Sequence, residues 1–402
     1  MQILVQKFGG TSVASHELRL AAIRHVEVAL SEGYQVVVVV SAMGRKGDPY
    51  ATDTLLSLLQ GVDLGSPRDK DILMSCGETI SAVVFAAALR GRGHDVVVLN
   101  GGQAGISTSD RFGDARILEI RPQRILSELE NGRIVVVMGF QGVNEDGDVT
   151  TLGRGGSDTT ATALAVALNA QRVDIFTDVD GIMTADPRIV DEARKLKRVT
   201  YTEICNLAYQ GAKVIHPRAV EIAMQKNVPI RVRSTQSMDE GTLVTSATAV
   251  LETATVADRF LTGVTQTAPV TQISVHQEEL RGQNVFALMA EHAISVDFIS
   301  VGTDRVTYTV PGKDGQKAAE LIRGLGAGPQ VVENCAKVAA VGAGIAGVPG
   351  IMAKIVDSLR KEDIEILQSA DSHTTIWCLV HGEQMEKAVR ALHQAFELDS
   401  PV

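Results

Sequence analysis

Five consecutive valines at residues 36–40 constrain the fold more than any other feature of this chain. The run has turn-forming residues on both sides and no polar residue to face water, which predicts a strand buried on both faces, the kind found in parallel sheets covered by helices. A shorter apolar run precedes it at residues 3–5, and apolar residues recur at helical spacing between Leu18 and Leu30. This opening predicts a strand, helix, strand unit of an α/β fold.

The same pattern continues. Apolar runs at residues 95–99, 134–138 and 173–176 predict further strands, and residues 69–89 and 159–169 predict helices. At 402 residues the chain suggests two or three domains. The formal net charge of −10 argues against a broad surface for nucleic acid or anionic membrane, so any phosphate site must be local.

Cysteines and apolar runs indicate the compartment. The four cysteines lie far apart with no C-x-x-C pair, which suits a reduced protein with buried thiols better than a disulfide frame or a zinc site. No apolar run approaches the roughly 20 residues that a membrane helix needs. The apolar run within residues 1–7 is too short for a signal peptide. We therefore expect a cytoplasmic protein.

A glycine pair, Gly9 and Gly10, follows the first predicted strand and precedes a predicted helix. Unpaired N–H groups at a helix start favour an anion, and glycine lets the backbone approach a phosphate closely. Lys7 would direct a positive charge at the same place, and Thr11 and Ser12 would add hydroxyl donors. The alternative is a tight turn that merely needs glycine. The motif is neither a P-loop nor a Rossmann fingerprint.

A second glycine-rich turn, residues 153–156, opens the helix at 159–169 and carries Arg154. An arginine fork suits a carboxylate held at two points. Asp158 is placed either to cap the helix or to orient Arg154 and neighbouring donors. Two such turns at one sheet, one with lysine and one with arginine, are what phosphoryl transfer between two anions requires.

Other polar residues leave their roles open. Thr52 and Asp53 either cap a helix or contribute to a site, and Glu78 in an apolar stretch lies either in solvent near a helix end or opposite a ligand cation. The carboxylates after the strand at 173–176 suit a metal site, a nucleotide-hydroxyl site or a solvated loop. His216, before a proline, fits a structural role.

Several motifs in order resemble the aspartokinases of the amino acid kinase family. They are KFGGTSV at residues 7–13, Gly77-Glu78, GRGGSD at residues 153–158, the segment from Thr177 to Arg188, and Lys213. The resemblance spans nearly the whole chain. It implies a three-layer amino acid kinase fold with a mainly parallel central sheet, followed by two α+β ferredoxin-like ACT domains.

The resemblance also implies site residues. Those expected at the nucleotide and its phosphates are Lys7, Phe8, Gly9, Gly10, Ser41, Thr177, Asp178, Met183, Arg188 and Lys213. Those expected at aspartate are Thr52, Glu78, Arg154, Gly155, Gly156 and Ser157. Lys7, Arg154 and Asp158 would be catalytic, with Mg²⁺ bridging phosphates rather than held in a protein metal site. Met183 stands where some relatives have tyrosine, which leaves stacking on the base open.

The C-terminal part contains an internal repeat. Residues 294–310 align with residues 364–380 at an offset of 70 (364 − 294), and each copy predicts strand, helix, strand, strand, helix. These copies resemble tandem ACT domains, which sense amino acids. We expect a catalytic domain at 1–245, a linker at 246–258 and ACT domains at 259–335 and 336–402. The G-x-G-x-x-G at 342–347 is better explained by the ACT fold than by a dinucleotide site, because too little chain follows it.

The implied activity is transfer of the ATP γ-phosphoryl group to the side chain of L-aspartate, the entry to lysine, threonine, methionine and diaminopimelate synthesis. Alternatives are another carboxylate kinase of the family or a non-catalytic amino-acid sensor. The resemblance further implies feedback inhibition by diaminopimelate, lysine or threonine, with the diaminopimelate-sensitive type closest, and at least a homodimer through the ACT domains. The sequence leaves open which copy binds the effector, since only the second has Pro349-Gly350, and whether Met238 starts a separate subunit.

Overall fold

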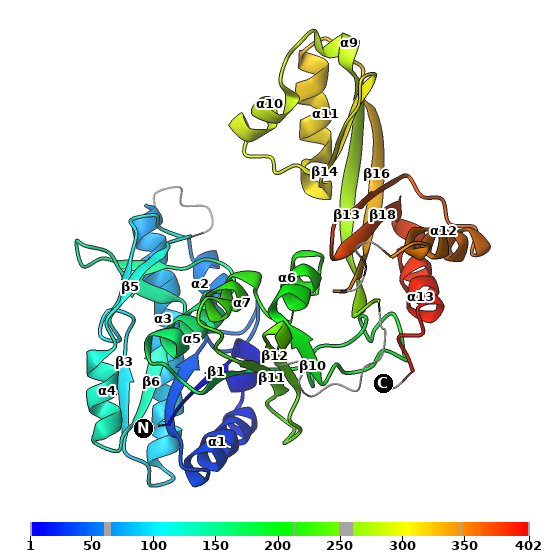
Figure 1. Ribbon diagram of the computed structural model, residues 1–402. Coiled ribbons are helices and arrows are strands. Elements are labelled where there is room, and N and C mark those ends of the chain that lie inside the picture. Colours follow the sequence, from blue (N-terminus) through cyan, green and yellow to red (C-terminus); the bar gives the residue numbers. More distant parts are fainter. Residues whose placement is uncertain are drawn as a thin grey trace. The chain divides into compact units, whose positions relative to one another are not determined.

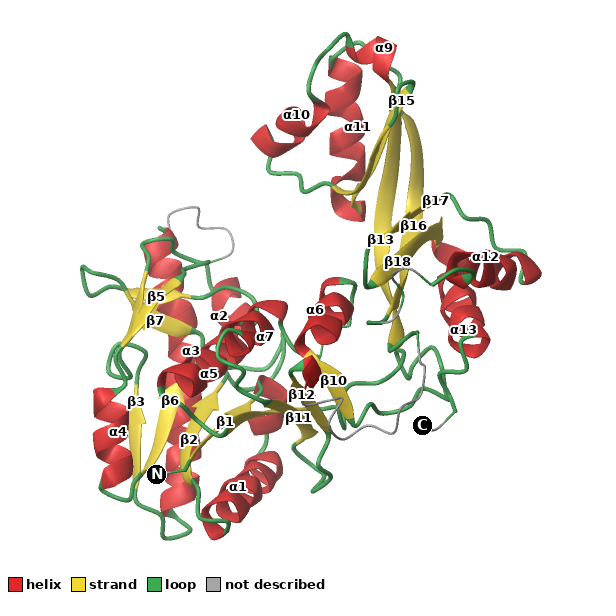
Figure 2. Cartoon of the chain, viewed as in Figure 1, coloured by secondary structure: helices red, strands yellow, loops and turns green. Residues whose placement is uncertain are grey.

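The computed structural model describes residues 2–59, 66–212, 214–248, 260–343, 345 and 348–400. The chain forms two compact units. The first contains Met1–Ile182, Lys195–Ala208 and Lys213–Thr255, and the second contains Met183–Arg194, Tyr209–Ala212 and Val256–Val402. Most of the predicted linker lies outside the described residues. Figures 1 and 2 show the elements of each unit.

A sheet of eight strands organises the first unit. Its order is β10 (Arg198–Thr200), β12 (Thr242–Thr245), β11 (Ile230–Ser234), β9 (Arg172–Thr177), β1 (Ile3–Phe8), β2 (Gln35–Val40), β6 (Ile134–Met138) and β3 (Val96–Leu99). All neighbours pair in parallel except β11 and β12. The mainly parallel sheet is therefore confirmed, and all five valines of β2 are buried as expected.

Helices cover both faces of this sheet. On one face, α1 (His16–Ser31) and α3 (Pro67–Arg90) bury apolar side chains against alternate residues of the strands, including Phe8 and Val38. Residues between them, such as Lys7, point to the other face, because side chains alternate along a strand. There α5 (Gly156–Ala167) packs on β1 and β9 and against α7 (Pro217–Met224). The unit also contains α2 (Thr52–Ser57), α4 (Gln123–Glu130) and α6 (Tyr201–Tyr209).

A smaller sheet lies beside α3, with the order β5 (Ile117–Ile120), β4 (Ile106–Thr108), β7 (Gln141–Val143) and β8 (Val149–Thr151). The α3 helix is long and apolar enough to cross a membrane by length and composition alone. Its side chains give a different account: Phe85 and Leu89 pack into the core of the first unit, and Asp71 and Glu78 are buried along it. It is a core helix of a folded unit.

The second unit is built on an antiparallel sheet of six strands that holds both copies of the repeat. The first copy contains β13 (Gly263–His276), α9 (Gln277–Leu280), α10 (Val285–Glu291), β14 (Asp297–Val301), β15 (Arg305–Pro311) and α11 (Gly315–Gly324). The second contains β16 (Gln330–Val341), α12 (Ile351–Lys361), β17 (Gln368–Asp371), β18 (Thr375–His381) and α13 (Met385–Ala395). Since β18 starts 70 residues after β15 (375 − 305), the structure confirms the predicted offset.

One segment of the N-terminal half belongs to the second unit. Met183–Arg194 leaves the first unit after Ile182 and packs Ile189 and Val190 into the core of the second repeat copy. The Thr184 hydroxyl lies 2.9 Å from Nε2 of His393 on α13. The predicted nucleotide residues Met183 and Arg188 are on this segment, where the Arg188 guanidinium pairs with Asp186 at 2.7 Å.

Candidate active site

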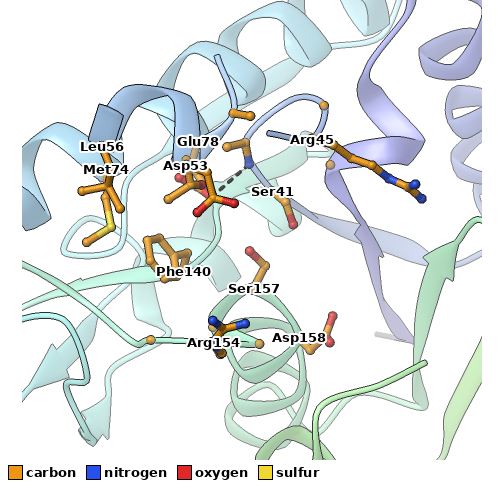
Figure 3. A pocket seen from close by; sticks show the side chains of 18 of the residues that line it. Ser41, Arg45, Asp53, Leu56, Met74, Glu78, Phe140, Arg154, Ser157 and Asp158 are labelled. Atoms are coloured by element: carbon orange, nitrogen blue, oxygen red, sulfur yellow. Dashed lines mark hydrogen bonds between the residues drawn. The ribbon is translucent and has the colours of Figure 1, made fainter. Parts of the chain in front are cut away.

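A cleft of about 510 Å³ opens at the carboxyl ends of β1, β2 and β6 and the start of α5. Parallel strands place these ends at one edge of the sheet, where ligands of open α/β folds bind. The cleft brings together ten residues that the sequence and its resemblance predict, namely Lys7, Gly10, Ser41, Thr52, Glu78, Arg154, Gly155, Gly156, Ser157 and Asp158. Figure 3 shows Glu78, Asp53 and Ser41 facing Ser157 and Arg154 across it.

Lys7 forms the main ion pair of the cleft. Its Nζ lies 2.7 Å from Oδ1 of Asp158, and both side chains are mostly buried. The helix α5 is capped by Gly155 in a left-handed conformation (φ +67), and Asp158 provides no capping hydrogen bond. Of its two predicted roles, capping is therefore wrong, and Asp158 instead fixes the position of the Lys7 ammonium group.

The first glycine turn differs from the prediction. Gly10 begins a short 3-10 helix, Gly10–Val13, while α1 starts at His16 with its own cap, Ser15. The Gly9 N–H donates to the Phe176 carbonyl at 3.2 Å, so this amide is already occupied. The Ser12 hydroxyl is buried and accepts a hydrogen bond from Thr235 at 2.6 Å. The expected donors of the turn thus partly serve the fold.

Gly10 is at its position because the backbone is crowded there. A Cβ on Gly10 would lie 2.6 Å from the Ala42 carbonyl oxygen and 2.7 Å from that of Gly44, so no larger residue fits. The loop after β2 therefore approaches the glycine turn closely. Phe8 is fully buried and stacks on Phe176 with ring centroids 4.7 Å apart, so its side chain does not line the cleft.

Glu78 is a buried carboxyl group at the floor of the cleft, 3% exposed. Its Oε1 accepts the Ala42 N–H at 2.9 Å, and its Oε2 has no hydrogen-bond partner among the described residues. Burial raises the pKa of Glu78 to about 8. Such a group suits a ligand cation, because a buried carboxylate needs a charge partner.

Arg154 provides the second cation of the cleft. Its side chain is exposed, and no carboxylate within the described ranges pairs with it. The turn that carries it is packed tightly: a Cβ on Gly155 would lie 2.2 Å from the Cβ of His216. His216 therefore has the structural role that the sequence suggests, and burial lowers the pKa of its ring. Arg154 is held on a fixed backbone and remains open to an incoming anion.

Several predicted nucleotide residues lie elsewhere or cannot be placed. Thr177 ends β9, which pairs with β1, and Asp178 follows it and pairs with Arg45, which lines the cleft. Met183 and Arg188 belong to the second unit, and Lys213 lies outside the described residues. The roles of these five residues stay predictions.

Sequence reasoning missed other residues of the cleft. Arg45 and Lys46 follow the end of β2, and Phe140 follows the end of β6 with a left-handed backbone (φ +70). Their place in the chain was the available signal, since a residue just after a parallel strand reaches the same edge of the sheet. Thr52, which was predicted, and its neighbour Asp53 also line the cleft, and neither is the N-cap residue of α2, which is Ala51.

Comparisons with known proteins identify the family. A family model described as amino acid kinase family matches residues 2–234, and an ACT domain model matches residues 330–394. More than half of the chain thus matches one family of phosphotransferases. The fold and the cleft define the first unit as an amino acid kinase.

Relatives over the full length narrow the class. The chain is 56% identical to aspartokinase 1 of Bacillus subtilis over 99% of this chain and all of the relative. It is 40% identical to an aspartokinase of Corynebacterium glutamicum over 99% of this chain and 97% of that protein. The crystal structure of E. coli aspartokinase III in complex with aspartate and ADP matches with a TM-score of 0.78 at 28% identity, covering 98% and 99% of the two chains. The chain belongs to the aspartokinases.

Proposed function

We propose that the cleft transfers the γ-phosphoryl group of ATP to the side-chain carboxylate of L-aspartate, which gives ADP and 4-phospho-L-aspartate. The observation that carries this proposal is that Lys7, on the strand before the first glycine turn, and Arg154, within the second glycine-rich turn, line one cleft. Two anions must meet for this reaction, and a separate cation for each lets them do so. The related E. coli enzyme was crystallised with aspartate and ADP.

Aspartate would be held by opposite charges across the cleft. Arg154 would form a two-point contact with the α-carboxylate, and Glu78 would accept the α-ammonium group on its unpartnered Oε2. Thr52, Ser157, Gly155 and Gly156 would complete this side, since they line the same cleft, although the Gly156 N–H already donates to the Gly153 carbonyl at 3.0 Å. Binding the ammonium group favours the ionised form of Glu78 and so requires its proton to leave.

The phosphoryl group would be transferred near Lys7. The attacking carboxylate is already ionised at neutral pH, so the reaction needs no strong general base. One carboxylate oxygen forms a bond to the γ-phosphorus, and the bond between that phosphorus and the bridging oxygen of ADP breaks. Lys7 would neutralise the charge on the group in transfer, while Asp158 keeps its Nζ in place.

The nucleotide would reach this point from the neighbouring ends of β2, β1 and β9, since Ser41 follows β2, Thr177 ends β9 and Asp178 comes next. The described residues contain no cluster of three or more His, Cys, Asp or Glu side chains that would hold a metal ion. Mg²⁺ would accordingly take most of its ligands from phosphates and water, as this ion commonly does with nucleotides. It would supply charge neutralisation during transfer.

Feedback would act through the second unit, and we assign the effector to its second repeat copy. A cavity of about 840 Å³ lies there between the start of α12 and the turn after β17. The helix start favours a carboxylate and Asp371 favours an ammonium group, so together they match an amino acid. Calorimetric titration with diaminopimelate, lysine and threonine tests this site: one should bind, and Asp371→Asn should weaken it. Heat from none of the three would refute it.

Two experiments test the remaining proposals. ADP release should be fastest with L-aspartate, whereas a preference for glutamate or acetylglutamate, or no turnover at all, would overturn the assignment.

Light scattering should give at least a dimer, which we expect to form through the second unit. A strictly monomeric active enzyme would contradict that expectation.

A further inference from the structure

Asp71 is a buried carboxylate that no step of the reaction uses. It lies on α3 seven residues before Glu78, is fully buried and does not line the cleft. Its Oδ2 accepts the Gly113 N–H at 3.0 Å and the Thr151 N–H at 2.7 Å, and its Oδ1 accepts the Thr151 hydroxyl at 2.8 Å. A carboxylate in this environment requires such donors. It therefore ties two distant backbone segments to α3.

Arg218, on a different helix from Asp71, holds the same two backbone segments. This half-buried residue of α7 donates from Nη1 to the Leu152 carbonyl at 2.9 Å and from Nη2 to the Ala115 carbonyl at 3.0 Å. Burial lowers the pKa of its guanidinium group. Asp71 thus accepts backbone amide hydrogens from Gly113 and Thr151. Arg218 donates to backbone carbonyl oxygens two residues further along the first segment (115 − 113) and one residue further along the second (152 − 151).

The two segments are also joined to each other and to the substrate turn. Ala115 N–H donates to the Thr151 carbonyl at 2.8 Å, and Leu152 N–H donates to the Phe140 carbonyl at 2.9 Å. Gly153 follows with a left-handed backbone (φ +73), and a Cβ there would lie 3.2 Å from the Gly113 carbonyl oxygen. The next residue is Arg154. Five of these seven hydrogen bonds involve Thr151 or Leu152, which lie three and two residues before Arg154, and the other two hold Gly113 and Ala115 on the segment that bonds to Thr151.

We infer that Asp71 and Arg218 are positioning residues that fix the backbone from which Arg154 binds the substrate carboxylate. The inference rests on the proposed role of Arg154. The turn contains three glycines, at 153, 155 and 156, which alone leave the backbone mobile. A two-point contact between an arginine and a carboxylate requires that the backbone carrying the arginine stay in place, because a shift of about 1 Å is enough to reduce the rate on the order of 100-fold.

The test compares Asp71→Asn and Arg218→Gln with a matched control, Arg68→Ala. Arg68 lies on the same helix as Asp71 and pairs with Asp148 at 2.5 Å, next to β8. Among the described residues, it forms no hydrogen bond with either of the two segments that Asp71 and Arg218 hold, residues 113–115 and 151–152. We expect Asp71→Asn and Arg218→Gln each to raise the aspartate KM about 10-fold while the ATP KM stays within about twofold. Arg68→Ala should change neither.

A double variant separates positioning from general stability. If Asp71 acts through Arg154, Asp71→Asn combined with Arg154→Ala should raise the aspartate KM no further than Arg154→Ala alone. Effects that multiply, equal rises of both KM values, or an unchanged aspartate KM in either single variant would overturn the inference. If Asp71→Asn does not fold, Arg218→Gln carries the same comparison. An unchanged aspartate KM in Arg154→Ala would instead refute the proposed role of Arg154.

Discussion

The two glycine-rich turns bring a cation to the same cleft in different ways. In the first, Lys7 lies on a strand, its ammonium group is mostly buried and Asp158 pairs with it. In the second, Arg154 lies within the turn itself and is exposed, with no carboxylate partner in the described part of the chain. A paired, buried cation is preorganised for a charge that develops during reaction, whereas an open one suits a charge that arrives with a substrate. This difference supports the proposal that the two turns serve different substrates.

Replacing Lys7 should have the largest effect. For Lys7→Ala we expect kcat to fall on the order of 100-fold to 1,000-fold, as removal of one preorganised group that stabilises transition-state charge commonly does. The aspartate KM should change much less. Steady-state kinetics with both substrates varied measures this, and a variant that keeps wild-type kcat would remove Lys7 from the chemistry.

Replacing Arg154 should mainly affect binding. In Arg154→Ala the aspartate KM should rise about 10-fold to 100-fold, consistent with the loss of charge-assisted hydrogen bonds. Arg154→Lys keeps the charge but not the planar fork, so its aspartate KM should lie between that of the unmodified protein and that of Arg154→Ala. Should lysine restore the KM completely, the two-point contact would be wrong and a simple charge would suffice.

The glycines of the two turns should differ in stability. Gly155→Ala places a Cβ against His216 on a left-handed backbone, and we expect it to lower the free energy of unfolding by about 1–3 kcal/mol. Gly9→Ala has an ordinary φ of −67° and contacts of 3.4 Å or more, so it should change that free energy by less than about 0.5 kcal/mol. Urea unfolding of both variants gives the comparison, and equal effects would contradict it.

The smallest expected effect is a pH dependence from Glu78. Its pKa of about 8 leaves the carboxyl group largely protonated at pH 6.5, and only the ionised form pairs with the ammonium group of aspartate. The aspartate KM should therefore fall several-fold between pH 6.5 and pH 8.5. Glu78→Gln should give a higher KM that no longer changes over this range. An equally steep dependence in that variant would exclude Glu78 as the titrating group.

The same pKa predicts a stability effect of known sign. The folded protein keeps a proton on Glu78 that the unfolded chain releases near pH 4.5. The contribution of this group to folding is therefore present at low pH and is lost as pH rises through about 8. Relative to Glu78→Gln, the free energy of unfolding of the unmodified protein should decline as the pH rises from about 4.5 to about 8.

Sequence patterns correctly predicted the secondary structure and the repeat, which depend on the local periodicity of apolar residues. The valine run of β2, the alternation of strands and helices, and the 70-residue repeat all appear in the structure. The glycine motifs also indicated correctly where the cleft lies, because the order of strands in a parallel sheet brings their ends together.

Contacts between distant residues were beyond such patterns. The pairing of Asp158 with Lys7 joins positions 151 residues apart (158 − 7), and local propensity indicated a cap instead. Asp71 appears as one more acid in a helical stretch until the fold places Gly113 and Thr151 against it. Residues 183–194 continue a catalytic motif in sequence but pack into the second unit.

Calorimetric titration of aspartate into the unmodified protein, Lys7→Ala and Arg154→Ala most directly tests whether the two cations serve different substrates. We predict that Arg154→Ala weakens the aspartate Kd about 10-fold or more, while Lys7→Ala leaves it within about threefold. Equal weakening in both variants would contradict the assignment of one turn to each substrate.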